Sequence, residues 1–208
     1  MRSRVPNLLR RCRRCYFPPA ACLCPFIPKL ATATRVVFVR HAAERVRTTN
    51  TGRWAALALE RSEVLEHAVA GAPLDLSRLA GGDSAAVLFP SGATRPLPLP
   101  PPATLVVPDG TWAQARRMLQ RIPALRALPR FSLPERPGDR LRRPTVSQGM
   151  STLEAVAAAL EALGEGGAAK ALLELHLLAV ARGRALRWPS RPGARGPGPS
   201  AAAPLPEP

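Results

Sequence analysis

Short apolar runs, separated by polar or proline-rich stretches, dominate the hydrophobic pattern of this chain. Uninterrupted runs of about four to eight residues are typical of strands that are buried on both faces, as in a parallel sheet. They predict strands at 35–40, 85–89 and 104–107, a short strand starting at 64–65, and a strand at 128–133. Because proline has no amide hydrogen, Pro129 restricts the last of these to a sheet edge.

Helical patterns alternate with these runs. Two segments, 111–121 and 151–163, repeat apolar residues every three or four positions, the spacing of one helix face. A third follows turn and cap residues at 49–52, and a fourth lies near the end of the main domain. The predicted helices cover 53–61, 111–121, 151–163 and 168–182. Strands that alternate with helices are typical of an α/β fold with a mainly parallel sheet and flanking helices.

Proline content indicates how the chain is divided. With 25 prolines in 208 residues, long helices are confined to a few windows. We expect a basic arm at 1–11, a cysteine module at 12–28, one main domain at 29–187, and a disordered tail at 188–208 that is rich in Pro, Ala and Gly. No run approaches the roughly 18 apolar residues of a membrane span, so an integral membrane protein is not expected.

The chain is strongly basic. Lys and Arg number 30 against 14 Asp and Glu, which gives a formal net charge of +16. A field of this strength favours an anionic partner, and nucleic acid is the most common one. A genome biased toward arginine and proline codons is the alternative explanation of the same composition.

All four cysteines lie in the cysteine module, at Cys12, Cys15, Cys22 and Cys24. Two close thiol pairs separated by a short loop are typical of a tetrahedral zinc site with four thiolates. Two disulfides or free thiols are the alternatives. Since zinc thiolates require a reducing compartment, we expect a cytoplasmic protein. The arginine-rich start, which has no acidic residue, leaves import into an organelle as the alternative.

Two predicted helices start with capping boxes, at 111–114 and 151–154. Asp109 stands between a buried strand and the first box. Ligands usually bind at such junctions along the carboxyl edge of a parallel sheet, so Asp109 is a candidate general base or ligand anchor. Two well-capped helices without a site are the alternative. The chain has no G-x-G-x-x-G and no P-loop, which argues against a dinucleotide site and an NTPase.

The three histidines are weaker candidates for a functional site than Asp109 or the cysteines. His41 and Glu44 follow the first predicted strand, three residues apart and beside several arginines. They form either a metal or acid–base pair or, as we favour, parts of local ion pairs. His67 and His176 belong to no recognisable constellation.

Seven motifs in order resemble those of the DTW-domain family, which is named for its Asp-x-Thr-Trp sequence. They are Cys12-x2-Cys15 with Cys22-Leu23-Cys24-Pro25, His41-x2-Glu44, the segment 49–53, Leu88-Phe89-Pro90, Asp109-Gly110-Thr111-Trp112-x2-Ala115, the segment 140–142 and the segment 151–155. Members of this family are tRNA-uridine aminocarboxypropyltransferases. The resemblance therefore implies transfer of the 3-amino-3-carboxypropyl group of S-adenosylmethionine to N3 of a tRNA uridine, with release of 5′-methylthioadenosine. It also implies a SPOUT-like fold with a knotted cofactor site in 29–187.

The resemblance further implies roles for individual residues. Asp109 would be the catalytic base that takes the N3 proton. S-adenosylmethionine would be surrounded by Leu88, Phe89, Pro90, Asp109, Gly110, Thr111, Trp112, Ser151, Thr152 and Glu154. Zinc on the four cysteines would be structural. Phosphates of the tRNA partner would be bound by Arg13, Arg14, Lys29, Arg53 and Arg142.

Two other functions are open at this point. One is an S-adenosylmethionine-dependent RNA methyltransferase that uses the same pocket. The other is a non-catalytic RNA-binding protein that keeps the zinc module. Either a monomer or a homodimer is compatible with this sequence.

Overall fold

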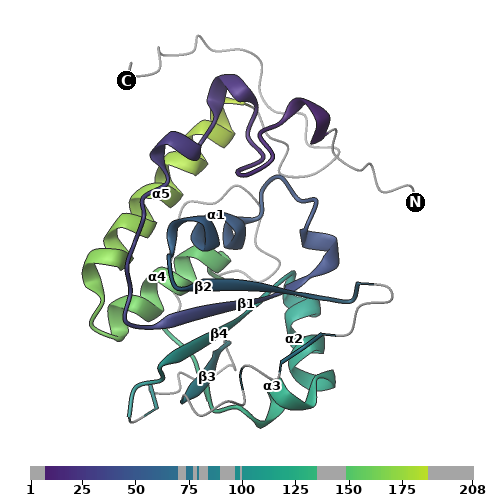
Figure 1. Cartoon of the computed structure of the whole chain (residues 1–208), viewed down its shortest axis with the longest axis vertical. Coiled ribbons are helices and arrows are strands. Elements are labelled where there is room, and N and C mark those ends of the chain that lie inside the picture. The colour runs from purple at the N-terminus through teal and green to yellow at the C-terminus, as the bar shows by residue number, and fades with distance from the viewer. Residues whose placement is uncertain are drawn as a thin grey trace.

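The computed structural model describes residues 8–69, 74–76, 79, 84–89, 97–98, 100–134 and 149–186. Within them, five strands form one sheet in the order β2-β1-β4-β3-β5, and every neighbouring pair is parallel (Figure 1). The strands are β1 (Arg35–His41), β2 (Ser62–His67), β3 (Ala85–Leu88), β4 (Thr104–Asp109) and β5 (Arg130–Phe131). The predicted α/β fold with a mainly parallel sheet is confirmed.

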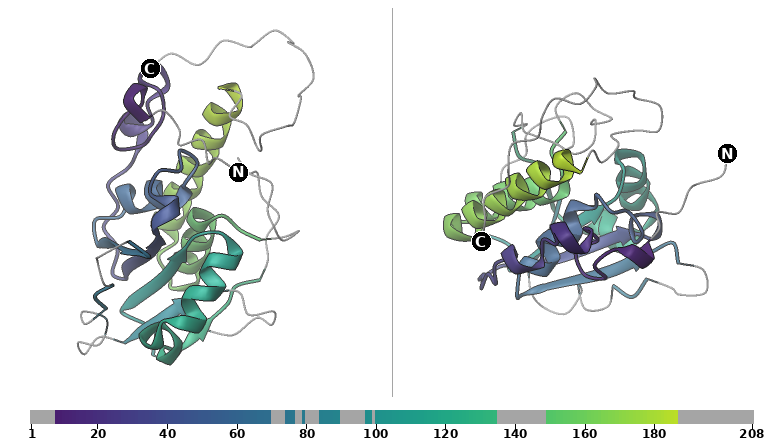
Figure 2. Two further views of the ribbon diagram at one scale, coloured as in Figure 1. Left: turned by 90° about the vertical axis from the view of Figure 1, so that its right-hand side faces the viewer. Right: turned by 90° about the horizontal axis from the view of Figure 1, so that it is seen from above.

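Five α-helices cover the sheet in the described part of the chain. They are α1 (Thr51–Ala58), α2 (Trp112–Arg121), α3 (Pro123–Ala127), α4 (Thr152–Ala162) and α5 (Gly166–Ala185). Helices α1, α4 and α5 lie on one face, and α2 and α3 lie on the other (Figures 1 and 2). Short 3₁₀ turns occur at Leu8–Arg10, Pro19–Ala21, Cys24–Phe26 and Ala42–Glu44. Among the described helices, none is both long enough and apolar enough to span a membrane.

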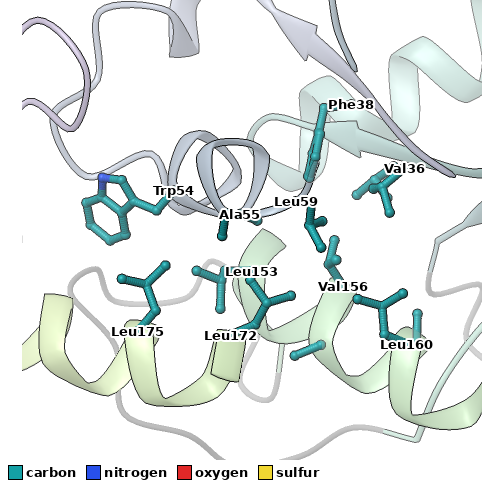
Figure 3. Packing of buried hydrophobic residues seen from close by; sticks show 14 of the residues in the cluster. Val36, Phe38, Trp54, Ala55, Leu59, Leu153, Val156, Leu160, Leu172 and Leu175 are labelled. Atoms are coloured by element: carbon teal, nitrogen blue, oxygen red, sulfur yellow. The ribbon is translucent and has the colours of Figure 1, made fainter. Parts of the chain in front are cut away.

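Alternate residues of the central strands face opposite layers, as the two-residue period of a strand requires. Val36 and Phe38 of β1 belong to the core under α1, α4 and α5. Val37 and Val39 belong to a second core under α2 and α3. Figure 3 shows how side chains of α1, α4 and α5 meet in the first core. Because both faces are covered, the strands read as continuous apolar runs in the sequence.

Strand β4 is longer than its apolar run predicts. It runs through Pro108 and ends at Asp109, whereas the sequence places its end before the proline. Pairing between β3 and β4 ends at Val106, two residues before Pro108. The missing amide hydrogen of Pro108 therefore removes no hydrogen bond between these two strands. Asp109 is therefore the last residue of a central strand rather than part of a turn.

The segment predicted as a strand at 128–133 contributes only β5. This strand lies at the sheet edge, as Pro129 requires. The preceding helix α3 is not predicted. Pro123 stands at its first position, where a missing amide hydrogen costs nothing, and five residues are too few to show a helical period.

Other predicted boundaries shift by a few residues. Helix α1 ends at Ala58 instead of 61, β2 extends from Ser62 to His67, and α5 spans Gly166–Ala185 instead of 168–182. The predicted tail at 188–208 and most of the basic arm lie outside the described residues.

The packing of α5 can be tested with two leucines. Leu172 is fully buried, whereas Leu177 is 56% exposed on the same helix. We expect Leu172→Ala to lower the free energy of unfolding by about 2–5 kcal/mol, because it removes buried contacts and leaves a cavity. Leu177→Ala should change it by less than about 0.5 kcal/mol. Urea denaturation measures both, and equal destabilisation would contradict this packing.

Candidate functional site

The four thiols of the cysteine module converge. The Sγ atoms of Cys12, Cys15, Cys22 and Cys24 all lie within 4.8 Å of one another. Those of Cys12 and Cys24 are 3.5 Å apart, and those of Cys15 and Cys22 are 3.7 Å apart. Four sulfurs at about 2.3 Å from one zinc ion stand about 3.8 Å apart, at the corners of a tetrahedron. All four thiols are free, and their arrangement fits a tetrahedral metal site such as one for zinc.

The surroundings of these thiols also suit a metal. The amide of Leu23 donates to Sγ of Cys15 at 3.4 Å. Burial raises the pKa of the Cys12 thiol, but hydrogen bonds from the backbone of Cys15 and Arg14 and from the thiols of Cys24 and Cys15 together bring it to about 6. Burial and the neighbouring thiols raise the pKa of Cys22 and Cys24, so the thiolate, which is the form that binds zinc, is favoured at Cys12 rather than at all four cysteines.

The cysteine module packs directly against two helices. Nε1 of Trp54 in α1 donates to the carbonyl oxygen of Cys15 at 3.0 Å, and the indole lies 5.5 Å from the ring of Phe17. Arg182 of α5 donates to the carbonyl oxygen of Cys22 at 3.0 Å. Trp54 and Phe17 are fully buried. The module therefore shares the core that α1, α4 and α5 enclose.

Asp109 is the centre of a buried hydrogen-bond network at the carboxyl edge of the sheet. The residue is only 2% exposed. Asn50 donates to its Oδ2 at 2.8 Å, and the hydroxyl of Thr152 donates to its Oδ1 at 2.8 Å. Asn50 caps α1, and Thr152 is the first residue of α4. The carboxylate thus joins the end of β4 to the starts of two helices.

Gly52 leaves room for this carboxylate. A Cβ atom at position 52 would lie 2.8 Å from Cγ and from both carboxylate oxygens of Asp109. Such a contact is far shorter than van der Waals distance. Close approach, rather than an unusual backbone angle, is the reason for glycine here.

Burial also sets the acidity of Asp109. It raises the pKa of this carboxyl above the ordinary value, and the charge of Glu44 acts in the same direction. Hydrogen bonds from Asn50 and Thr152, and the charge of Arg40, lower the pKa again. A carboxylate with a raised pKa accepts a proton more readily near neutral pH than an ordinary aspartate does.

An open pocket lies where β3 and β4 end and α2 and α4 begin. Its empty volume is about 650 Å³, including space at its mouth. The rings of Phe89 and Trp112 stand 5.2 Å apart on its wall. The lining residues are Leu88, Phe89, Val107, Pro108, Gly110, Trp112, Ala115, Leu133, Met150, Thr152 and Ala155.

Five of the residues predicted to contact the cofactor line this pocket. They are Leu88, Phe89, Gly110, Trp112 and Thr152. Asp109 is not among the lining residues and meets the pocket through the hydroxyl of Thr152. Pro90 lies outside the described residues.

The remaining predicted cofactor residues form the two caps. Thr111 and Ser151 each complete a capping box, so both predicted boxes exist. Glu154 accepts from the amide of Ser151 at 2.8 Å and lies 3.8 Å from Nε2 of the buried His176. These side chains fix where α2 and α4 begin, beside the pocket.

His41 and Glu44 make contacts with neighbouring residues. Glu44 lies 3.9 Å from Arg47 in an ion pair within one turn. Nδ1 of His41 accepts from the amide of Ala43 at 3.1 Å and lies 3.3 Å from the side-chain nitrogen of Gln114. The favoured interpretation as local pairs therefore fits Glu44.

The residues predicted to bind RNA differ in exposure. Arg13, Arg14 and Lys29 are exposed. Arg53 is only half exposed, and its guanidinium lies over the ring of Tyr16. Arg142 lies outside the described residues.

Comparison with known proteins identifies the family. A sequence model of the DTW domain matches residues 9–182 of the chain. The chain belongs to the DTW-domain family. It is 31% identical over 171 residues to a protein of Drosophila melanogaster named tRNA-uridine aminocarboxypropyltransferase 2, and the alignment covers 76% of this chain and 68% of that protein. No solved structure matches the chain.

Each position of the DTW motif has a different structural task. Asp109 ends β4 and joins two helices. Gly110 and Trp112 line the pocket, and Thr111 caps α2. A Cβ atom at Gly110 would lie 3.1 Å from the side chain of Gln114, so the turn into α2 is tight.

Two site residues of this DTW domain are not identified by sequence reasoning. Asn50 and Gly52 belong to the segment 49–53, which the sequence gives as turn and cap residues and as one of the motifs of the family resemblance, without a site role for either residue. Asn50 does cap α1, since its Oδ1 accepts from the amide of Arg53 at 2.7 Å. When the side-chain oxygen of a buried Asn caps a helix, its side-chain NH2 group still needs a hydrogen-bond acceptor. That requirement indicates a buried polar partner for Asn50, which the structure shows to be Asp109.

The fit between Gly52 and Asp109 can be tested with an added methyl group. We expect Gly52→Ala to lower the free energy of unfolding by about 1–3 kcal/mol, because the new Cβ must displace a buried carboxylate. Gly167→Ala is the control, since a Cβ there meets nothing within 4 Å. It should be neutral or stabilise the protein by up to about 1 kcal/mol. A Gly52→Ala protein as stable as the unmodified chain in urea would contradict the contact.

Proposed function

We propose that this DTW-domain protein is a tRNA-uridine aminocarboxypropyltransferase. It transfers the 3-amino-3-carboxypropyl group of S-adenosylmethionine to N3 of a tRNA uridine and releases 5′-methylthioadenosine. Membership of the DTW-domain family supports this function, as does the name of the similar Drosophila protein. The observation that carries the proposal is the pocket at the sheet edge, because three residues of the Asp109–Ala115 motif, Gly110, Trp112 and Ala115, line it.

The pocket suits a nucleoside donor with a charged amino-acid tail. Phe89 and Trp112 offer apolar area to an adenine ring. Helices α2 and α4 begin beside it, and the amino ends of helices attract carboxylates. A sulfonium can lose a methyl group or the aminocarboxypropyl group. Orientation of the donor therefore decides which carbon meets the uridine.

The reaction needs one proton transfer besides the displacement. A bond forms between N3 and the aminocarboxypropyl carbon while the carbon–sulfur bond breaks. The electron pair of that bond stays on sulfur, which leaves as a neutral thioether. The proton on N3 must be removed, because the deprotonated nitrogen is the stronger nucleophile.

We assign this proton transfer to Asp109 acting through Thr152. Both oxygens of Asp109 already accept hydrogen bonds, and the residue is almost fully buried. Thr152, by contrast, lines the pocket and donates to Asp109. When its hydroxyl accepts the N3 proton, its own proton passes to Oδ1 of Asp109. The raised pKa of Asp109 favours this last step.

The cysteine module and the basic surface complete the proposal. Zinc held by the four cysteines would fold the module, which is rich in proline. Arg13, Arg14 and Lys29 are exposed there and would contact tRNA phosphates. A thiolate zinc site also fits a reducing compartment, which supports the cytoplasm as the location.

One reaction tests the function. Zinc-loaded protein is incubated with unmodified tRNA and S-adenosylmethionine, and the nucleosides and small products are analysed by mass spectrometry. We expect aminocarboxypropyluridine together with 5′-methylthioadenosine. A methylated nucleoside with S-adenosylhomocysteine would replace the proposal by a methyltransferase. Binding of tRNA without any product or donor binding would favour a non-catalytic RNA-binding protein.

The proton path predicts a contrast between two substitutions of Thr152. Thr152→Val removes the hydroxyl, so we expect kcat to fall by about 100-fold or more, the usual contribution of acid–base catalysis. Thr152→Ser keeps the hydroxyl and should stay within about 10-fold. The KM for tRNA should change little in both variants. A kcat for Thr152→Val within threefold or so of the unmodified enzyme would exclude Thr152 from the path.

A further inference from the structure

The cysteine module touches α1 at two neighbouring residues, Arg53 and Trp54. Trp54 donates to the carbonyl oxygen of Cys15. The guanidinium carbon of Arg53 lies 3.8 Å from the ring centroid of Tyr16, which is a cation–π contact. Tyr16 directly follows Cys15 in the chain. Both contacts therefore fall on the turn that carries one of the four thiols.

The backbone of Tyr16 is held in an unusual conformation. Its φ of 65° lies in the left-handed region, which residues with side chains rarely adopt. The amide of Tyr16 donates to the carbonyl oxygen of Cys12 at 2.9 Å, and its own carbonyl oxygen accepts from Arg11 at 3.1 Å. Such a conformation persists only where the surroundings impose it. The turn that gathers the thiols therefore also aims the ring of Tyr16.

Both the side chain and the backbone amide of Arg53 are held by other residues. Its side chain lies over Tyr16 and donates to the carbonyl oxygen of Arg45 at 2.5 Å. Its backbone amide donates to Oδ1 of Asn50 at 2.7 Å. Burial lowers the pKa of its guanidinium, as expected for a cation that is partly removed from water. These contacts distinguish Arg53 from the exposed arginines of the module.

Asn50 continues the series to the site. Its Oδ1 accepts from Arg53, and its Nδ2 donates to Oδ2 of Asp109 at 2.8 Å. The side-chain amide is planar and 3% exposed, so it cannot turn away from one partner without weakening its contact with the other. A continuous series of contacts thus runs from Tyr16 through Arg53 and Asn50 to Asp109.

We propose that Tyr16 and Arg53 are positioning residues, which couple the folded cysteine module to the hydrogen-bond network of Asp109. This inference rests on the zinc site and on the role of Asp109 proposed above. Helix α1 has only eight residues, and helices this short are not stable alone. Its first turn depends on contacts from outside the helix, which include the buried Trp54 and the ring of Tyr16 over Arg53. Loss of the ring frees Asn50 and slows the reaction without removing any group that touches the substrate.

Hydrogen exchange of the zinc-loaded, full-length protein tests the coupling. Tyr16→Ala removes the ring but keeps a residue that is equally unsuited to positive φ, so only the ring contact changes. We expect this variant to retain one zinc per chain. Amides in the peptide covering 50–58 should exchange about five times faster than in the unmodified protein, and kcat should fall by about 10-fold with little change in the KM for tRNA. Removal of zinc by a chelator should accelerate exchange in the same peptide.

Two conservative variants separate positioning from other roles. Tyr16→Phe keeps the ring face and loses only the hydroxyl, which also interacts with Arg53, so its amide exchange at 50–58 should stay much closer to that of the unmodified protein than to that of Tyr16→Ala. Arg53→Lys keeps the charge but loses the planar guanidinium. Amides at 50–58 in this variant should therefore exchange as fast as they do in Tyr16→Ala. Zinc-loaded Tyr16→Ala with unchanged exchange at 50–58 would overturn the proposal. Unchanged exchange at 50–58 in Arg53→Lys would also overturn it. Lysine keeps the positive charge that binds phosphate but loses the planar guanidinium that lies over the Tyr16 ring. The exchange measurement needs neither donor nor tRNA, so it stands even where the proposed reaction fails.

Discussion

A buried carboxylate has to be compensated, and the arrangement around Asp109 follows from that requirement. An unpaired charge in the interior would destabilise the protein by several kcal/mol. The compensation comes from Asn50 and Thr152, which belong to the starts of two different helices. Strand β4, α1 and α4 must therefore meet at one point. Gly52 permits the approach, because any side chain there would occupy the place of the carboxylate.

The position of the pocket follows from the same junction. The carboxyl ends of β3 and β4 lie at one edge of the parallel sheet, and α2 and α4 start there with complete capping boxes. Each cap satisfies amides that would otherwise need other partners. With its polar groups satisfied in this way, the edge can present an apolar wall that includes Phe89 and Trp112. Thr152 then links this wall to the buried carboxylate.

The parts of this structure that depend on local sequence could be predicted, and those that depend on long-range contacts could not. Strand runs, the two capping boxes and the cysteine cluster each follow from residues close together in the chain. The pairing of Asn50 with Asp109 joins positions 59 residues apart. The motif at 49–53 draws attention to Asn50 but does not name its partner. Arg53 is a similar case, since the sequence predicts a phosphate contact for it, whereas burial and Tyr16 make it a structural contact.

Docking of the cysteine module bears on how an RNA would be used. Trp54 and Arg182 bind carbonyl oxygens of the module from two helices, so the module is part of the core rather than a tethered appendage. Phosphate contacts made from a tethered module would add affinity only. If the exposed Arg13 and Arg14 contact phosphates as proposed, their place on a docked module would also fix the register of the RNA relative to the pocket. In the proposed reaction, the position of the uridine relative to the donor determines which atom is modified. A fixed register of the RNA would therefore contribute to specificity, which affinity alone does not.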